Sequence, residues 1–118
     1  MAATKTSKTL YASASLAAAT SVNATEWNMT TCYGGLACVK LTNGGTAPTT
    51  APIVKFYVGE ASGTKRLLYT AAGDTVNSSV NDFVCEVPAG AMYCNITVTN
   101  GATNAITVEA YGQELTTV

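Results

Sequence analysis

Residues 87–115 read Val-Pro-Ala-Gly-Ala-Met-Tyr-Cys-Asn-Ile-Thr-Val-Thr-Asn-Gly-Ala-Thr-Asn-Ala-Ile-Thr-Val-Glu-Ala-Tyr-Gly-Gln-Glu-Leu, and this stretch decides the fold. Apolar and polar residues alternate along it with a period of two, and the alternation breaks only near Pro88 and at Asn100-Gly101. Such alternation is typical of half-buried antiparallel strands that are joined by turns. The stretch carries almost no reactive side chain, so its residues serve packing and turn formation.

The same pattern extends through the rest of the chain. It predicts strands over residues 10–18, 22–29, 36–42, 53–58, 65–71, 80–87, 92–99 and 105–115. No segment of ten residues shows a helical stripe. Short strands at this spacing predict an all-β fold, a single antiparallel β-sandwich of about eight strands with either jelly-roll or Ig-like Greek key topology. We expect residues 1–9 to form an extended N-terminal arm and residues 10–118 to form the sandwich domain.

Composition narrows the classes of partner. A chain of 118 residues forms one hydrophobic core, and only 11% of its residues are charged, against about 25% in typical domains. Its six Lys and Arg residues and net charge of −1 cannot build the basic face that nucleic acid requires. No apolar run approaches the roughly 18 residues of a membrane span. We therefore expect no nucleic-acid partner and no membrane partner.

The residue inventory also argues against catalysis. The chain has no His, which is the commonest general base, and the spacing of its carboxylates proposes no acid–base pair. The four cysteines lack the short spacing of a zinc knuckle, and the paired glycines do not form a phosphate loop. We expect a protein that is not an enzyme, with no catalytic residues, no cofactor and no metal site.

Two turns carry predictions about strand pairing. If Pro88–Ala91 is a hairpin loop, Cys85 faces Cys94 across the ladder, with Cβ atoms about 4.5 to 5.5 Å apart. The pair is then either two small buried apolar side chains or a disulfide. After Asn100, a three-residue loop would pair Val98 with Ile106. Alternatively, the two strands around that turn lie in opposite sheets.

The N-terminal segment has two interpretations. Polar residues interrupt the Ala-rich run that follows Lys5 and Lys8, so we expect a mature arm and not a cleaved leader. The arm could add as a strap to a neighbouring subunit. Residues 10–18 could equally be an ordinary first strand of the chain's own sheet.

Three motifs carry a resemblance to a known family: Thr31-Cys32-Tyr33-Gly34-Gly35 leading to residues 39–44, the turn at residues 86–93, and the ending at residues 106–115. Together they resemble small β-sandwich head proteins of tailed bacteriophages, the capsid cement or decoration proteins. The resemblance covers most of the chain from about Leu10, and the cysteines depart from it. It implies a virion protein, made in the host cytoplasm, that binds the outer surface of the major capsid protein lattice and self-associates as a dimer or trimer.

Candidate assembly contacts follow from this interpretation, since aromatic residues are enriched at interface centres. They are Lys5, Lys8, Leu10, Tyr11, Trp27, Tyr33, Tyr57 and Tyr111. An alternative is a tail, fibre or baseplate-associated β-sandwich module for adhesion or assembly. A third class, a secreted or pilus-like subunit, would require a cleavable leader.

Overall fold

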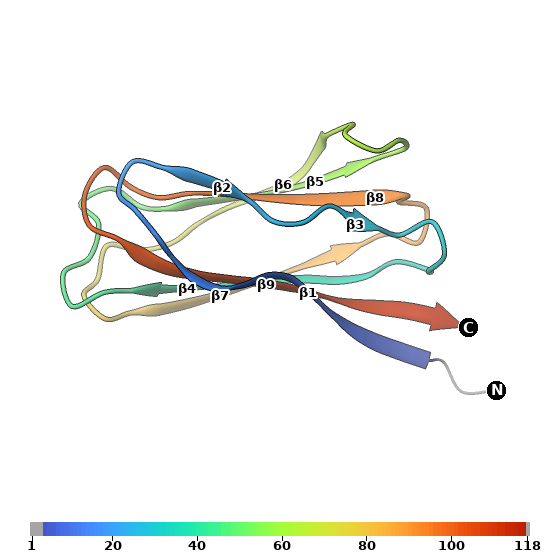
Figure 1. Ribbon diagram of the computed structural model, residues 1–118, viewed down its shortest axis with the longest axis horizontal. Coiled ribbons are helices and arrows are strands. Elements are labelled where there is room, and N and C mark those ends of the chain that lie inside the picture. The colour runs from blue at the N-terminus through green and yellow to red at the C-terminus, as the bar shows by residue number, and fades with distance from the viewer. Residues whose placement is uncertain (1–3, 118) are drawn as a thin grey trace.

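The computed structural model describes residues 4–117, which form nine strands in two facing antiparallel sheets (Figure 1). One sheet has the order β1-β9-β4-β7, with bounds Thr4–Leu16, Ile106–Thr117, Gly35–Asn43 and Val80–Val87. The other has the order β2-β8-β5-β6, with bounds Ser21–Asn23, Tyr93–Thr99, Ile53–Gly59 and Arg66–Ala72, and β3 (Trp27–Asn28) also pairs with β8. The predicted all-β antiparallel sandwich is confirmed.

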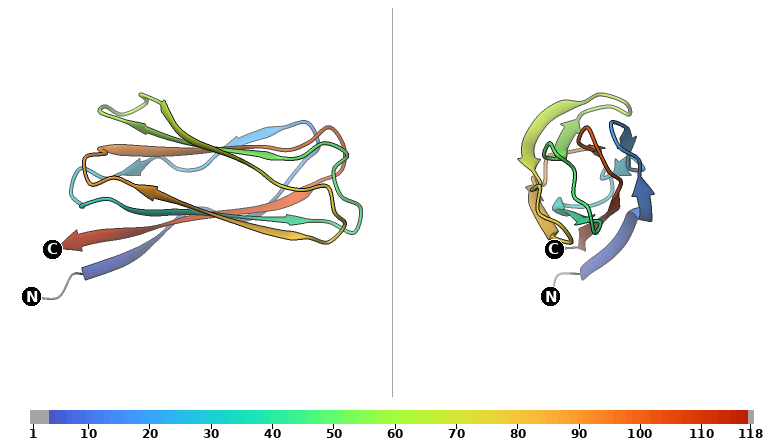
Figure 2. Two further views of the ribbon diagram at one scale, coloured as in Figure 1. Left: turned by 180° about the vertical axis from the view of Figure 1, so that it is seen from behind. Right: turned by 90° about the vertical axis from the view of Figure 1, so that its left-hand side faces the viewer.

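The topology is that of a jelly roll. Because β2 and β3 both pair with β8, they are two pieces of one interrupted strand, which leaves eight strand positions. Between these positions, only the β5–β6 connection joins neighbours in one sheet, and every other connection within residues 4–117 crosses to the opposite sheet. Figure 2 shows the two layers from behind and end-on. This crossing pattern is that of the jelly roll and excludes the Ig-like alternative.

Strand positions match the sequence prediction closely in most cases. The predicted strand 80–87 coincides with β7, and β4, β5, β6, β8 and β9 lie within two residues of their predicted bounds. The predicted strand 22–29 is broken in the middle. There the amide of Ala24 still bonds the Ile96 carbonyl, at 2.9 Å, whereas the amide of Thr25 bonds the Leu10 carbonyl of β1, at 2.9 Å. After Ala24 the chain therefore leaves the ladder with β8 and contacts β1, the edge strand of the other sheet.

The core lies between the sheets and is filled by the inward side of each alternating strand. Trp27 has no solvent exposure, and its indole Nε1 donates a hydrogen bond of 2.6 Å to Glu114 Oε1. The Trp27 ring lies on Gly112 of β9, where a Cβ atom would come within 2.8 Å of the ring. Gly112 therefore makes room for the largest side chain of the core.

Buried asparagines tie the connections together at the end of the sandwich away from the start of β1. Asn100 Nδ2 donates to the carbonyls of Leu16, Ala17 and Asn104, at 3.1, 3.3 and 2.9 Å. Asn43 Nδ2 donates to the carbonyls of Asp74 and Val76, at 3.2 and 2.9 Å. Asn100 and Asn43 thereby link their own strand ends to connections that are distant in the sequence.

The predicted opposition of Cys85 and Cys94 is wrong. Cys85 on β7 is paired with Ala37 of β4, whereas Cys94 on β8 is paired with Val58 and with Trp27. The chain crosses between sheets after Val87, so β7 and β8 are not ladder partners. All four cysteines are free thiols and are buried. The alternative for the turn after Asn100 is confirmed, since β8 and β9 lie in opposite sheets.

The predicted extended N-terminal arm is, over its described part, a strand of the four-stranded sheet. Residues 4–9 form the first half of β1 and pair with β9, from Thr4 opposite Thr117 to Thr9 opposite Tyr111. Residues 1–3 lie outside the described residues. The start of β1 and the end of β9 lie side by side at one end of the molecule (Figures 1 and 2). Residues 10–16 are thus the ordinary first strand of the sheet. Within the described part of the chain, no helix could cross a membrane.

Candidate functional site

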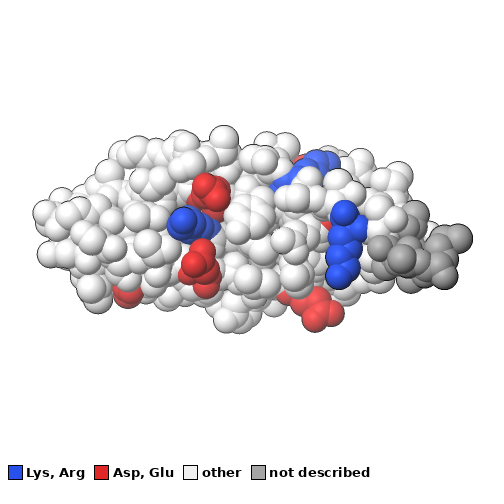
Figure 3. Space-filling model, turned by 90° about the horizontal axis from the view of Figure 1, so that it is seen from below, with Lys and Arg blue, Asp and Glu red and all other residues white. Residues whose placement is uncertain are grey.

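The outer face of the four-stranded sheet carries the strongest candidate for a contact surface. On β4, Ala37, Val39 and Leu41 fill the core, so the intervening residues 36, 38 and 40 point outward. Viewed from this side, most of the surface is uncharged, and acidic and basic side chains lie next to one another near its middle (Figure 3). Lys40 of β4 is paired there with Asp82 of β7 and Glu109 of β9. A partner could cover the uncharged part of this face without removing charges from water.

An apolar row crosses the middle of this outer face. Cys38 on β4 lies between Val84 of β7 and Tyr111 of β9 in the ladder register. Val84 is 60% exposed, whereas Cys38 is only 8% exposed although it points away from the core. Burial, with a smaller contribution from Asp82, raises the pKa of the Cys38 thiol. The thiol therefore stays protonated at neutral pH and acts as a small apolar side chain.

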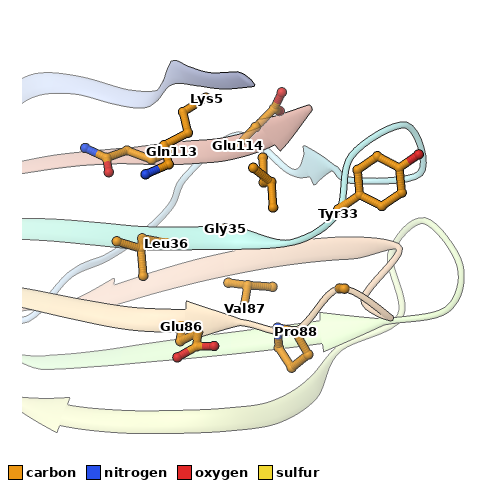
Figure 4. Close-up of a pocket in the computed structure, with 11 residues that line it drawn as sticks. Lys5, Tyr33, Gly35, Leu36, Glu86, Val87, Pro88, Gln113 and Glu114 are labelled. Atoms are coloured by element: carbon orange, nitrogen blue, oxygen red, sulfur yellow. The ribbon is translucent and has the colours of Figure 1, made fainter. Parts of the chain in front are cut away.

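A shallow pocket of about 380 Å³ lies at the end of this face where β1 begins and β9 ends. It is lined by Lys5, Tyr33, Gly35, Leu36, Glu86, Val87, Pro88, Ala89, Gln113, Glu114 and Leu115. Figure 4 shows Lys5, Gln113 and Glu114 on the β1–β9 side, and Glu86, Val87 and Pro88 on the opposite side. The lining supplies apolar contact area together with charged groups of both signs.

Gly34 sets the path of the backbone beside the pocket, directly before the lining residue Gly35. Gly34 has φ +78°, and a Cβ atom there would lie 2.5 Å from the Val87 carbonyl oxygen, so only glycine fits without strain. The amide of Tyr33 bonds the Leu115 carbonyl at 2.7 Å, and the amide of Leu115 bonds the Gly34 carbonyl at 3.0 Å. These bonds hold Tyr33 at the rim, where its side chain is 52% exposed.

The charged groups in the pocket are not arranged as a reactive cluster. Glu114 accepts the Trp27 indole hydrogen bond, and Lys8 Nζ lies 3.8 Å from Glu114 Oε1. Lys5 and Glu86 line the same pocket but form no ion pair with any residue from 4 to 117. In the same range, no three His, Cys, Asp or Glu side chains are grouped closely enough to hold a metal ion.

The structure separates the predicted contact residues into three groups. Lys5, Tyr33 and Tyr111 share the outer face of the four-stranded sheet, and the first two line the pocket. Leu10 and Trp27 are 2% and 0% exposed, so the prediction that they contact a partner is wrong.

The remaining three candidates lie elsewhere. Tyr11 is half-buried against the core, and Lys8 lies beside Glu114. Tyr57 lies on the other sheet, with Lys65 Nζ 5.9 Å from its ring centre. For these residues a contact role stays a prediction.

Leu36, Val84 and Glu86 are not among the contacts predicted from the sequence, although the alternation places Glu86 on an outward strand position. The alternation contains this signal, since each of these residues follows or precedes a core residue on its strand and so points outward. That they form one surface depends on β4 and β7 being neighbours, which no local pattern specifies.

The sequence matches no protein-family model, and no curated protein has a detectably similar sequence. Several solved structures share the fold. A chain from the disulfide-linked pili of Bacillus endospore appendages is 15% identical, with a TM-score of 0.57 over 100% of this chain and 93% of that chain. The SPBc2 prophage-derived protein YomS is 19% identical, with a TM-score of 0.53 over 96% of each chain.

A chain from infectious bursal disease virus, Gt strain, is 8% identical, with a TM-score of 0.57 over 97% of this chain but 32% of that chain. At these identities the similarity establishes the fold alone. The fold of this chain is therefore one that also occurs in a pilus, a prophage-derived protein and a virus.

Proposed function

We propose that the protein is a non-enzymatic structural protein of a bacteriophage particle that binds the outer surface of the major capsid lattice as a cement or decoration protein. The observation that carries the proposal is the outer face of the four-stranded sheet, on which Tyr33, Leu36 and Val84 are exposed. Exposed apolar side chains on a rigid sheet suit a protein contact. The resemblance of the turn motifs to phage head proteins supports the same assignment.

The energetics of such a role are simple. A protein that binds the expanded lattice but not the unexpanded one stabilises the expanded state by the free energy of that binding. Apolar contacts at the centre of an interface contribute most of this free energy. On this face Lys40 lies between Asp82 and Glu109 in the ladder, so these charges keep neighbours of opposite sign when a partner covers them, which limits the cost of desolvation.

The occurrence of this fold in a prophage-derived protein and in a virus is compatible with the proposal. The pilus chain, which this chain covers almost completely, shows that the fold also serves in an assembled filament. These similarities support a role in assembly, and they do not favour one kind of particle over another.

The test uses expanded heads prepared without this protein. Purified protein is added, its occupancy is mapped by cryo-electron microscopy, and the temperature at which the heads release DNA is measured. We expect lattice-wide copies and a higher release temperature. Tyr33→Ser combined with Leu36→Ser should reduce occupancy, whereas Leu67→Ser with Tyr69→Ser, exposed on β6 of the other sheet, should not.

Equal occupancy for the two double variants would reject the proposed face. The absence of binding to heads would reject the cement role. A few copies at one vertex would instead support the tail, fibre or baseplate alternative.

A further inference from the structure

β7 forms one edge of the four-stranded sheet, and its ladder is unprotected along its whole length. Edge strands expose unpaired N–H and C=O groups, and proteins usually blunt them with short length, bulges or covering segments. β2 and β3 have only three and two residues, and the ladders of β1 and β6 contain register shifts. The β4–β7 ladder runs over eight residues without any shift.

The side chains of β7 indicate what kind of strand could pair with this edge. Val80 and Val84 are exposed on it, and Asp82 and Glu86 point to the same outer side. β7 contains no Lys, Arg or Pro that would discourage pairing. Its occupant should therefore be an extended strand that carries positive charge.

The first half of β1 meets this description on a second copy of the chain. β1 contains Lys5 and Lys8 but no Asp or Glu. From Lys5 to Thr9 it pairs with β9 without a register shift, and all of these residues are exposed. The Leu10 carbonyl is already bonded by Thr25, so the open edge of β1 is the part before Leu10.

We infer that residues 4–9 of one copy add to β7 of a second copy and continue its four-stranded sheet. All three ladders of this sheet are antiparallel, so β7 runs opposite to β1. A copy that is moved sideways without turning over brings its β1 beside β7 in the antiparallel sense. The backbone groups of both edges are then paired, which is the β-augmentation mode of recognition.

The charges select a register. Lys5 points to the outer face because it is paired with Leu115, two residues from Gln113 on the same side, and Glu86 points there as the partner of Leu36. Placing Lys5 opposite Glu86 puts Ser7 opposite Val84 and Thr9 opposite Asp82. Opposite charges in directly opposed positions stabilise a strand pair, and like charges destabilise it.

This contact joins two different surfaces, so a pair of copies leaves one β7 edge and one β1 edge free for further copies. Such heterologous contacts close into rings or continue as filaments, according to the rotation between neighbours. The self-pairing needs no capsid, and it is measured in the absence of heads. A chain that fails to bind heads can still pair with itself.

The test measures association of the full chain by sedimentation velocity at low salt, at concentrations up to about 1 mM. We expect concentration-dependent association of the unaltered chain. Lys5→Glu and Glu86→Lys should each weaken it about tenfold, by replacing an attractive pair with a repulsive one. The double variant should recover most of the loss. Lys55→Glu is the matched control, since Lys55 is exposed on β5 of the other sheet and the change in net charge is the same.

Two results would overturn the inference. The first is a chain that stays monomeric over this concentration range. The second is a double variant that associates no better than the single variants, because only directly opposed charges can compensate each other in this way. Circular dichroism of each variant verifies that the exposed substitutions leave the fold intact.

Discussion

Gly112 shows how one missing side chain fixes the packing of the largest one. A Cβ atom at this position would lie 2.8 to 3.0 Å from three carbons of the Trp27 ring. The ring is fully buried and anchored to Glu114 by its indole nitrogen, so it has no room to move away. The close approach also explains why Trp27 belongs to the core although its strand is only two residues long.

We predict that Gly112→Val lowers the free energy of unfolding by about 1 to 3 kcal/mol, the usual range for overpacking a well-packed core. Urea unfolding monitored by Trp27 fluorescence measures the change. Gly45→Ala is the matched control, because nothing lies within 4 Å of a Cβ atom there. Equal stability of the Gly112 variant and the unaltered chain would contradict the described packing.

At the same scale, the alternation predicted on which side of its strand each side chain lies, but it did not predict which side chains other segments bury. On β5, Val54 and Phe56 are buried and Lys55 is exposed, as the period of two requires. Trp27 is predicted as a contact because it is aromatic, and Leu10 because it lies in the N-terminal segment that could reach a neighbouring subunit. Burial of these two side chains depends on segments far away in the sequence, and no local pattern encodes that packing.

At the scale of elements, Asp74 organises the connection between β6 and β7. Its carboxylate accepts hydrogen bonds from Asn81 Nδ2, Ser79 Oγ, the Val76 amide and Asn43 Nδ2, at 3.0, 2.7, 3.1 and 2.9 Å. These bonds, led by those from Asn81 and Ser79, hold the pKa of Asp74 below its ordinary value. The ionised carboxylate therefore fixes the loop to the end of β4.

This lowered pKa gives the sign of a pH effect. A carboxyl group whose pKa is lower in the folded chain stabilises the fold above its unfolded pKa of about 3.9, and the stabilisation is lost as pH falls through the folded value. We predict that Asp74→Asn lowers the free energy of unfolding at pH 7 and that this difference narrows towards about pH 2. Urea unfolding at both pH values tests it.

Asp82→Asn serves as the matched control for the same substitution on an exposed strand position. It should leave the free energy of unfolding at pH 7 nearly unchanged. An Asp74→Asn effect that is equally large at both pH values would mean that the hydrogen-bond network does not depend on the charge.

Strand spans were predictable from the sequence, whereas strand partners were not. β7 occupies the predicted residues 80–87, yet the expected opposition of Cys85 and Cys94 failed because β7 and β8 lie in opposite sheets. The Pro88–Ala91 segment suits a hairpin and a crossing connection equally well. In a hairpin, Val87 and Cys94 would enter the core from the same sheet, whereas in a crossing connection they enter it from facing sheets. Both arrangements satisfy the same alternation.

At the scale of the whole molecule, the sandwich core and residues 4–9 of β1 contribute differently to stability and to assembly. The core cluster begins at Leu10, and residues 4–9 are all exposed. These residues contribute backbone pairing with β9 and the Lys5 side of the pocket. The fold and the proposed assembly surface are thus separable along the chain, which permits a test that alters one and spares the other.

We predict that deleting residues 2–9 leaves a cooperatively folded jelly roll that no longer self-associates. Net hydrogen-bond free energies of about 0.5 to 1.5 kcal/mol each are offset by about 1 to 2 kcal/mol of backbone entropy for each ordered residue. The loss of stability should therefore stay within about 2 kcal/mol. Urea unfolding followed through Trp27, the single tryptophan, measures it, and sedimentation measures association. Loss of cooperative unfolding would show that residues 4–9 are required by the fold, whereas retained association would show that the pairing edge lies elsewhere.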